Sequence, residues 1–334
     1  MLSGTVDGRI ETHLLCFACQ LVSFQRHERM SERKRWGEVR VLSLFDGISC
    51  GMVALERAGI KVDTYYASEI DKNAIAISQK NYPNIVRLGD VTKWREWDID
   101  WSQIDLLIGG SPCQGFSFAG KQLNFDDPRS KLFFEFVDIL NHIKSRNPNV
   151  KFLLENVKMK KEYEEVITKA LGHVPVKINS RKVSAQDRKR LYWANFYFTS
   201  PKDKNIKASD VIGCECFAGA MRGRRIDENG KRADSRKDLP IVQQIECRKD
   251  NKFNCVTTVS KDNVVVFSKE RFFPAKENKS KWRYLTADEA EKLQTLPAGY
   301  TDCVSESARI KAIGNGWTVD VIAHIFEGLV HGGD

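Results

Sequence analysis

A cysteine and a glutamate each follow a buried strand expected from the sequence. Cys113 comes after the apolar run Ile104–Ile108 and the turn residues Gly109–Pro112, and Glu155 ends the apolar run Val150–Leu154. A thiol that proline and glycines hold at an exposed strand end can act as a nucleophile, and a carboxylate at the same edge can act as an acid. The alternatives are a small buried thiol and a glutamate that caps the next helix. We expect nucleophilic chemistry assisted by a carboxyl group.

Two more acidic residues follow earlier strands. Glu69 comes after the expected strand Thr64–Ser68, and Asp90 comes after Asn84–Leu88. At the first position a carboxylate can accept both hydroxyls of a ribose, and at the second it can accept the amino group of an adenine. The turn Phe45–Gly51 lies at the same edge but has neither the G-x-G-x-x-G pattern nor a phosphate-binding lysine. A ribose, an adenine and no phosphate clamp suggest S-adenosylmethionine, although each acid alone could be a helix cap.

A basic stretch, residues 186–190, precedes the apolar segment Leu191–Trp193. If the stretch is extended, a period of two places Gln186, Arg188 and Arg190 on one face. Two guanidiniums on the working side of a sheet suit an anion, either a phosphate or a developing negative charge. The alternative is a solvated basic strand edge.

These residues need a sheet whose strands end at a common edge, and the first half of the chain predicts one. Helices are expected over residues 52–58, 71–80 with Asp71 as cap, 130–143 with Ser130 as cap, and 160–171. The expected strands are Val41–Phe45, Thr64–Ser68, Asn84–Leu88, Ile104–Ile108, Val150–Leu154, Val174–Ser184 and Leu191–Phe198. Strands that alternate with helices predict an α/β fold with a doubly wound, mostly parallel sheet.

The segment 196–282 has a different texture. Gly, Asp, Asn and Lys are frequent, helical periodicity is absent, and Cys255–Val259 and Val264–Ser268 look like short strands. We expect a smaller, irregular, strand-rich second domain there. Residues 37–195 and 283–334 should form the main domain, closed by helices that begin at a capping box on Thr286 and at Trp317. Residues 1–36 are expected to be a poorly ordered extension.

The basic charge of the chain is concentrated in one place. The 334 residues carry a net charge of +9, and residues 196–282 hold 19 Lys and Arg against 12 Asp and Glu, a net of +7. Such a segment suggests a polyanionic partner, with a solvated basic surface as the alternative. The 42% hydrophobic content excludes a disordered chain, and no apolar run reaches the ~20 residues of a membrane-spanning helix.

Cysteine usage indicates the compartment. The nine cysteines are an odd number in a chain whose N-terminus does not look like a secretory leader. We therefore expect free thiols and a cytoplasmic location. The close pairs Cys16/Cys19 and Cys214/Cys216 are not followed by a second pair at ligand spacing, so no metal site is expected.

Taken in order, these motifs resemble those of the DNA (cytosine-5) methyltransferases of bacteria and phages. The matching blocks are Phe45-Asp46-Gly47, Glu69, Asp90, Gly110-Ser111-Pro112-Cys113-Gln114, Glu155-Asn156-Val157, Gln186-x-Arg188-x-Arg190 and Gly314-Asn315-Gly316. The resemblance runs from Val39 to Leu329, and the last block also resembles the animal de novo methyltransferases. Residues 196–282 fall where the family carries its target-recognition domain.

The resemblance implies an S-adenosylmethionine-dependent methyltransferase fold and a reaction. The methyl group would be transferred to C5 of a cytosine flipped out of duplex DNA, through a covalent bond between Cys113 and C6. Glu155 would contact N3 and the amino group of the base. Arg188 would hold the base or its phosphate, and Arg190 would order the site.

The resemblance also assigns the remaining site residues. The expected cofactor contacts are Phe45, Asp46, Gly47, Ile48, Glu69, Ile70, Asp90, Val91, Asn315 and Trp317, with core packing as the alternative for Ile48 and Ile70. The expected DNA contacts are Gln114, Ser117, Gln186, Arg222, Arg224, Arg225, Lys231 and Arg232, the last five from the densest basic run. We expect a DNA-associated monomer with no membrane partner. A cognate restriction endonuclease is possible, without a stable complex.

Three other functions have sequence features that distinguish them. Amino-methyltransferases acting on adenine or cytosine carry Pro-Pro-aromatic after an acid or amide, whereas this chain has Ser111-Pro112-Cys113. The family branch that acts on tRNA has Pro-Pro-Cys and a shorter recognition region. A catalytically silent DNA-binding partner would be expected to lack Cys113 or Glu155.

Overall fold

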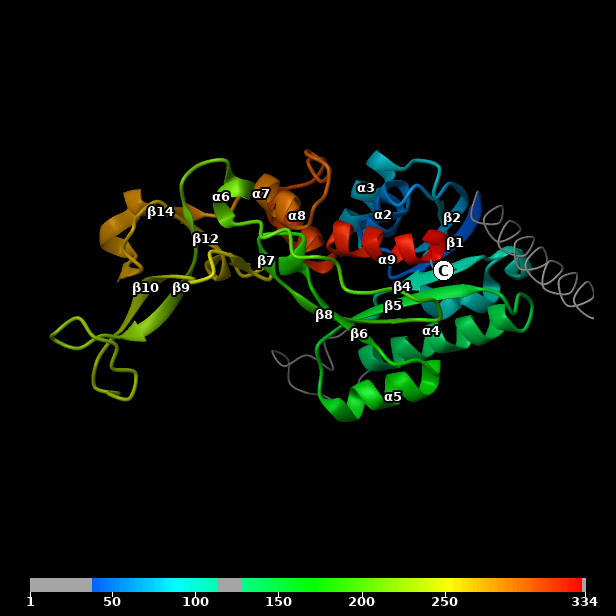
Figure 1. Cartoon of the computed structure of the whole chain (residues 1–334), viewed down its shortest axis with the longest axis horizontal. Coiled ribbons are helices and arrows are strands. Elements are labelled where there is room, and N and C mark those ends of the chain that lie inside the picture. The colour runs from blue at the N-terminus through cyan, green and yellow to red at the C-terminus, as the bar shows by residue number, and fades with distance from the viewer. Residues whose placement is uncertain (1–37, 113–127, 332–334) are drawn as a thin grey trace, which may run out of the picture.

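A seven-stranded sheet forms the centre of the computed structural model, which describes residues 38–112 and 128–331. The strands are β1 (Val39–Leu44), β2 (Val62–Ser68), β3 (Val86–Arg87), β4 (Leu106–Gly109), β5 (Lys151–Val157), β6 (Val176–Asn179) and β8 (Lys189–Ala194). Their order is β3-β2-β1-β4-β5-β8-β6, and only β8 runs antiparallel to its neighbours. The predicted doubly wound, mostly parallel sheet is confirmed (Figure 1).

Helices cover both faces of this sheet. On one face lie α2 (Cys50–Arg57), α3 (Lys72–Asn81) and α9 (Val319–His331), and on the other lie α4 (Pro128–Lys144) and α5 (Lys161–Leu171) (Figure 1). Alternation along β1 explains the two cores, because Val39 and Val41 pack on the first face and Leu42 and Leu44 on the second. Within the described ranges, no helix has the length and apolar character needed to cross a bilayer.

Local side-chain bonds fix where several helices begin. The Asp71 carboxylate accepts the backbone N–H groups of Asn73 and Ala74 at the start of α3, and Thr286 caps α7 (Ala287–Leu293), both as predicted. The helix α8 (Glu306–Asn315) was not predicted, and α4 begins before the expected cap at Ser130. Short 3-10 helices, η1 to η5, span Val91–Glu96, Trp101–Gln103, Ser180–Lys182, Ser260–Asp262 and Lys276–Lys281.

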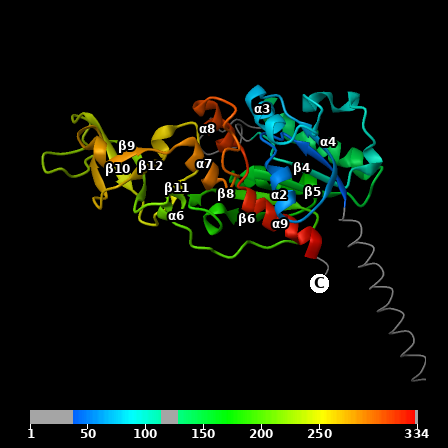
Figure 2. The same cartoon turned by 90° about the horizontal axis from the view of Figure 1, so that it is seen from above.

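A second, antiparallel sheet lies at the opposite end of the molecule from β1 and β2 in Figure 1 and from α4 in Figure 2. It contains β9 (Phe217–Arg225), β10 (Ile241–Cys247), β12 (Val264–Val266), β13 (Phe272–Pro274) and β14 (Trp282–Tyr284), in the order β13-β10-β9-β12-β14. The expected strand Cys255–Val259 is wrong. Instead, the short β11 (Phe253–Asn254) pairs with β7 (Gln186–Asp187), and a short helix, α6 (Ala208–Ile212), precedes β9.

The second sheet is joined to the first by shared core packing. Its segment contributes Cys216, Ala218, Phe253, Val256 and Val265 to the same apolar cluster as α2 and α9. The buried Lys252 ammonium donates to the backbone carbonyls of Arg181 and Ser184 in the main domain. A small core of its own, which includes Met221, Ile245 and Phe273, lies farther out. The division at residues 196 and 282 stays a prediction.

Candidate active site

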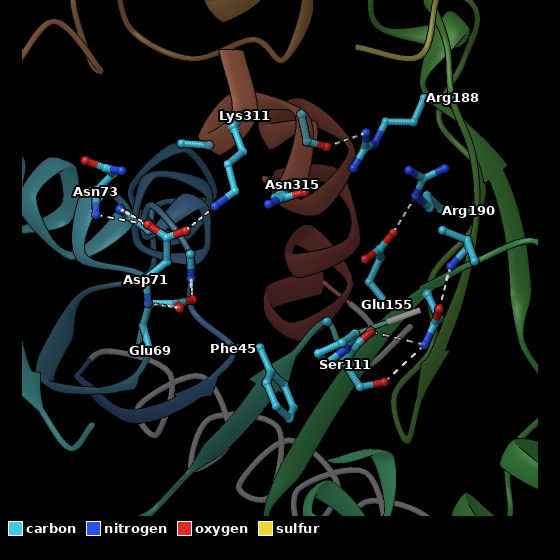
Figure 3. Close-up of a pocket in the computed structure, with 18 of the residues that line it drawn as sticks. Phe45, Glu69, Asp71, Asn73, Ser111, Glu155, Arg188, Arg190, Lys311 and Asn315 are labelled. Carbon is cyan, nitrogen blue, oxygen red and sulfur yellow. Dashed lines mark hydrogen bonds and ion pairs between the residues drawn. The ribbon is translucent and has the colours of Figure 1, made fainter. Parts of the chain in front are cut away.

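One cavity of about 290 Å³ lies where the carboxyl ends of β1, β2, β4 and β5 face α8 (Figure 3). This is the crevice beside the strand-order reversal between β1 and β4, where open α/β sheets bind their ligands. The predicted site residues that line it are Phe45, Gly47, Glu69, Glu155, Arg188, Arg190 and Asn315. The structure therefore brings the expected cofactor residues and the expected base-binding residues to a single cavity.

Backbone groups hold the Glu69 carboxylate at one end of the cavity. Oε1 accepts the N–H groups of Ile70 and Asp71 at 2.7 and 2.8 Å, and Oε2 accepts the N–H of Gly47 at 2.8 Å. The turn that supplies Gly47 is strained, because Phe45 has a positive φ of 57°. Since a carboxylate has about four acceptor positions, one remains for a ligand hydroxyl rather than the two that a ribose would offer.

The Glu155 carboxylate stands at the other end of the cavity. Its Oε2 accepts the indole N–H of Trp317 at 3.2 Å, and its Oε1 lies 2.9 Å from Nε of Arg190. The Arg190 contact is a charge contact without hydrogen-bond alignment, so the buried Oε1 has no hydrogen-bond partner in the described residues. A buried carboxylate oxygen beside a cavity is thereby left available to a ligand.

The two arginines next to Glu155 have different partners. Arg190 is nearly buried, and its pKa is raised because Glu155 and Cys255 outweigh the effect of burial, which alone would lower it. Arg188 donates to the backbone carbonyls of Gly314 at 3.0 Å and Gly316 at 2.9 Å, at the end of α8, and to Sγ of Cys255 at 3.1 Å. Arg190 therefore faces the reactive carboxylate, and Arg188 fixes the wall of the cavity.

The turn after β4 is tightly held where it leaves the sheet. The buried Asn156 amide donates to Oγ of Ser111 at 3.0 Å, and a Cβ added at Gly110 would lie 3.0 Å from Nε1 of Trp317 and 3.1 Å from Oε2 of Glu155. Glycine therefore lets the backbone pass beneath the carboxylate without pressing on Trp317 or Glu155. This turn leads directly to Cys113, which lies outside the described residues together with Gln114 and Ser117.

Four of the predicted cofactor contacts are not among the residues that line the cavity. Ile48 is fully buried in the apolar cluster of the first face, and Val91 is buried in that of the second. The Asp46 carboxylate accepts the hydroxyls of Ser49 and Tyr65, and its burial raises its pKa. Trp317 binds Glu155 instead of lining the cavity. The four cofactor assignments stay predictions.

Asp90 and Ile70 have the accessible positions that a ligand contact requires. Asp90 caps η1 by accepting the N–H of Thr92 at 2.9 Å, which is the alternative role that its position allowed. The Ile70 side chain is 71% exposed beside Glu69, so of the two isoleucines only Ile70 can flank an adenine. Both assignments stay predictions.

Gln186 is not at a DNA surface, which corrects its predicted role. Its side chain is fully buried, its amide donates to Oε1 of Gln294, and its carbonyl oxygen accepts the N–H of Val256. All of these partners belong to the protein. Gln186 therefore fastens the segment after β11 to the main domain.

The predicted DNA-reading arginines lie on the β9–β10 hairpin, and most are paired with acids. Arg222 binds Asp262 at 2.7 Å, Arg224 binds both oxygens of Glu246, and Arg232 binds Asp234. Arg225 donates to the carbonyl of Leu239, and Lys231 is exposed. A DNA phosphate or base would have to compete with these carboxylates for the arginines.

Three polar residues of the cavity lie outside the motifs that the sequence analysis singled out: Asp71, Asn73 and Lys311. Lys311 of α8 reaches across to Asp71, with Nζ 2.7 Å from Oδ2 (Figure 3). Asp71 was expected only as a helix cap, and Lys311 lies on the helix that was not predicted. One indication in the sequence that Asp71 lies near the cavity is its position two residues after Glu69.

Comparison with known proteins agrees with this geometry. A family model for C-5 cytosine-specific DNA methylase matches residues 39–193 and 218–331. The type II methyltransferase M1.ScrFI of Lactococcus lactis subsp. cremoris is 29% identical over 319 residues, covering 90% of this chain and 80% of that protein. The orphan methyltransferase M.SPRI of Bacillus phage SPR is 35% identical over 169 residues, covering 47% of this chain and 37% of that protein.

Two solved structures share the fold. The Dnmt2 methyltransferase of S. pombe aligns with a TM-score of 0.61 at 20% identity, covering 88% of this chain and 99% of that one. The methyltransferase EhMeth of Entamoeba histolytica aligns with a TM-score of 0.61 at 17% identity, covering 87% and 98%.

Proposed function

Because the chain belongs to the C-5 cytosine-specific DNA methylase family, we propose that it transfers the methyl group of S-adenosylmethionine to C5 of a cytosine flipped out of duplex DNA. The observation that carries this proposal is the buried Oε1 of Glu155, which is ion-paired with Arg190 but has no hydrogen-bond partner among the described residues, in the cavity that also contains Glu69. A cytosine placed there would supply the missing hydrogen bond from its amino group or from a protonated N3.

The proposed chemistry begins at Cys113. The Cys113 thiolate forms a bond with C6 of the base, while Glu155 interacts with N3 and the amino group, so that electron density moves to C5. When bound, S-adenosylmethionine would supply an electrophilic methyl group to C5 and would remain as S-adenosylhomocysteine. A water molecule then takes the proton from C5, and the electron pair of the C5–H bond re-forms the C5–C6 double bond and expels the Cys113 thiolate. Arg190 keeps the Glu155 carboxylate in place throughout.

The described residues fit the cofactor. Glu69 retains one acceptor position for a ribose hydroxyl, Ile70 offers an exposed apolar side chain, and the ring of Phe45 lines the cavity. The Lys311 ammonium in the cavity wall is bound to Asp71. A nucleoside without phosphates suits this set of groups better than a dinucleotide does.

Replacing Glu69 with Gln is expected to weaken cofactor binding. The amide nitrogen of the introduced side chain would repel the backbone N–H donors that now hold the carboxylate, and the charged acceptor for the ribose would be lost. We expect the Kd for S-adenosylmethionine to rise by roughly 10- to 100-fold, measured by isothermal titration calorimetry. The matched control is Glu135→Gln, on α4 away from the cavity; a Glu69→Gln variant with the wild-type Kd would contradict the assignment.

The second sheet is proposed to hold the DNA. Its segment carries a net charge of +7, and the β9–β10 hairpin extends away from the main sheet (Figure 2). We propose that the protein acts as a monomer, in which the hairpin reads the duplex and the cavity receives the flipped base. A cognate restriction endonuclease would act on the same DNA without forming a stable complex.

Replacing both Lys231 and Arg232 with Ala is expected to weaken DNA binding and its salt dependence. Each phosphate contact that is lost should lower the slope of log K against log salt by about 1. Fluorescence anisotropy with duplex DNA at several salt concentrations measures this slope. The control removes two positive charges from α5, by Lys161→Ala with Lys169→Ala. Equal slopes in the two double variants would show that the hairpin does not contact phosphates.

A methyl-transfer assay tests the proposed function. Tritiated S-adenosylmethionine is incubated with the full chain and either duplex DNA or tRNA, and the labelled base is identified by chromatography after digestion. We expect 5-methylcytosine in DNA. Label in N4-methylcytosine or N6-methyladenine, or label only in tRNA, would overturn the proposal in favour of the corresponding other activity.

A further inference from the structure

A cysteine sulfur lies between the two arginines behind Glu155. The Sγ atom of Cys255 is 3.1 Å from Nη1 of Arg188 and 3.6 Å from Nη2 of Arg190. The next residue, Val256, donates its N–H to the buried Gln186, and Asn263 donates to the carbonyl of Cys255. These two hydrogen bonds fix the backbone on both sides of Cys255. Its sulfur therefore has a defined position in the cluster that it forms with Arg188, Arg190 and Glu155.

Charge in the cluster is not balanced by Glu155 alone. Two guanidiniums lie close together, and the remaining acceptors that they use are the backbone carbonyls of Lys189, Gly314 and Gly316. A second positive charge held away from water is costly unless an anion accompanies it. An ionised sulfur at the position of Cys255 would provide that anion, because it faces both guanidiniums.

We propose that Cys255 is a positioning residue for Glu155: its sulfur accepts hydrogen bonds from both guanidiniums and so holds Arg190 against the carboxylate. The proposal rests on the proposed role of Glu155 in activating the base. Without the sulfur, the two guanidiniums would repel each other across an empty site. Arg190 would then turn away from Glu155, and the ion pair between them would be lost.

The environment of Cys255 favours the thiolate. Burial alone would raise the pKa of this thiol, but Arg188 and Arg190 outweigh burial and lower the pKa below its ordinary value. The charged groups that face the sulfur are these two arginines, from the β7–β8 segment, whereas α8 presents only backbone carbonyls to them. As the pH falls through the pKa of Cys255, the sulfur becomes neutral and its hold on Arg190 weakens.

Thiol alkylation measured against pH tests the charge state independently of any activity. The full chain is treated briefly with iodoacetamide at a series of pH values, and tryptic peptides 253–261 and 238–248 report Cys255 and Cys247 by mass spectrometry. Cys247 is the control because it is also partly buried, and burial raises its pKa. We expect the midpoint for Cys255 to lie at lower pH than that for Cys247. A midpoint at or above that of Cys247, or no reaction of Cys255 at any pH, would overturn an anionic sulfur.

Substitution tests the positioning role. We expect Cys255→Ala and Cys255→Ser to slow single-turnover methyl transfer roughly tenfold, as loss of an outer-shell partner does elsewhere, with the Kd for S-adenosylmethionine unchanged. In both variants, the fall in rate at low pH that is due to protonation of Cys255 should disappear from the pH–rate profile. Cys255→Asp should react faster than Cys255→Ala, because its carboxylate can also accept hydrogen bonds from the two arginines. Cys247→Ser is the matched control, and thermal unfolding checks the fold of each variant.

The outcomes separate the two proposals. Wild-type rates and an unchanged pH profile in Cys255→Ala would overturn the positioning role while leaving the methyltransferase function in place. A wild-type protein that methylates no DNA would overturn the proposed function, and the alkylation midpoint would still report whether the sulfur is ionised.

Discussion

Replacing Cys113 with Ser is expected to abolish methyl transfer and to leave DNA binding close to that of the wild type. A serine hydroxyl is only very weakly ionised near neutral pH, so it cannot attack C6 as a thiolate does. The turn that leads to Cys113 is held by Asn156 and Ser111, and neither contact involves the thiol. Radiolabel transfer and fluorescence anisotropy measure the two properties on the same preparation.

A trapping experiment sharpens this prediction. In duplex DNA with 5-fluorocytosine at the target position, the S–C6 bond can form and the methyl group can be transferred. The fluorine at C5 cannot leave as the C5 proton does, so the covalent adduct does not break down. The wild type should therefore gain the mass of the DNA strand under denaturing conditions, and Cys113→Ser should not. Cys303→Ser, which changes an exposed cysteine, is the control. Turnover or a trapped adduct in Cys113→Ser would rule out the covalent mechanism.

Replacing Glu155 with Gln is expected to lower kcat by about 10²- to 10⁴-fold, the usual contribution of an acid–base group. The amide has nearly the same shape, but it cannot exchange a proton with N3, and it removes the charge that faces Arg190. The effect should appear in the single-turnover rate, because cofactor contacts at the Glu69 end of the cavity are unchanged.

The control for Glu155→Gln is Asn156→Asp, which changes the neighbouring side chain that holds the Ser111 turn. Both variants should lower the Tm, Asn156→Asp because it disturbs the Ser111 turn and Glu155→Gln because it leaves the nearly buried Arg190 without its carboxylate. Only Glu155→Gln should also lower the single-turnover rate strongly, measured at a temperature where both variants are folded. A Glu155→Gln enzyme that retains the wild-type single-turnover rate would exclude Glu155 from base activation.

The catalytic end of the sheet could be predicted because its residues follow strands directly. Glu69 and Glu155 each stand at the carboxyl end of a parallel strand, and in a doubly wound sheet these ends meet along one edge. The cap at Asp71 was predictable for a similarly local reason, since the side chain bonds to N–H groups two and three residues ahead. Such relations depend on a few neighbouring residues and are visible in the sequence.

The roles of Gln186 and Arg188 depended on contacts that the sequence does not show. The stretch 186–190 is divided between β7, which pairs with β11, and β8, which belongs to the main sheet. Arg188 and Arg190 still reach the same cavity, as the alternation predicts, whereas Gln186 is fully buried. Gln186 and Arg188 bind Gln294 and the backbone of Gly314 and Gly316, more than 100 positions away in the chain. Lys311 was missed for the same kind of reason, because α8 is recognised only by its packing.

The shared core between the two sheets limits how new target specificities can arise. Phe253, Val256 and Val265 belong to the segment 196–282, which is proposed to hold the DNA, but they pack in the same apolar cluster as α2 and α9. Exchanging residues 196–282 as a cassette with a relative would therefore replace part of the catalytic interior as well as the recognition surface. The β9–β10 hairpin beyond Met221 is free of that constraint, so both evolution and engineering should be able to vary it at little cost to folding. The part of this enzyme that can be exchanged as a unit therefore begins partway along β9, at Met221, and not at residue 196.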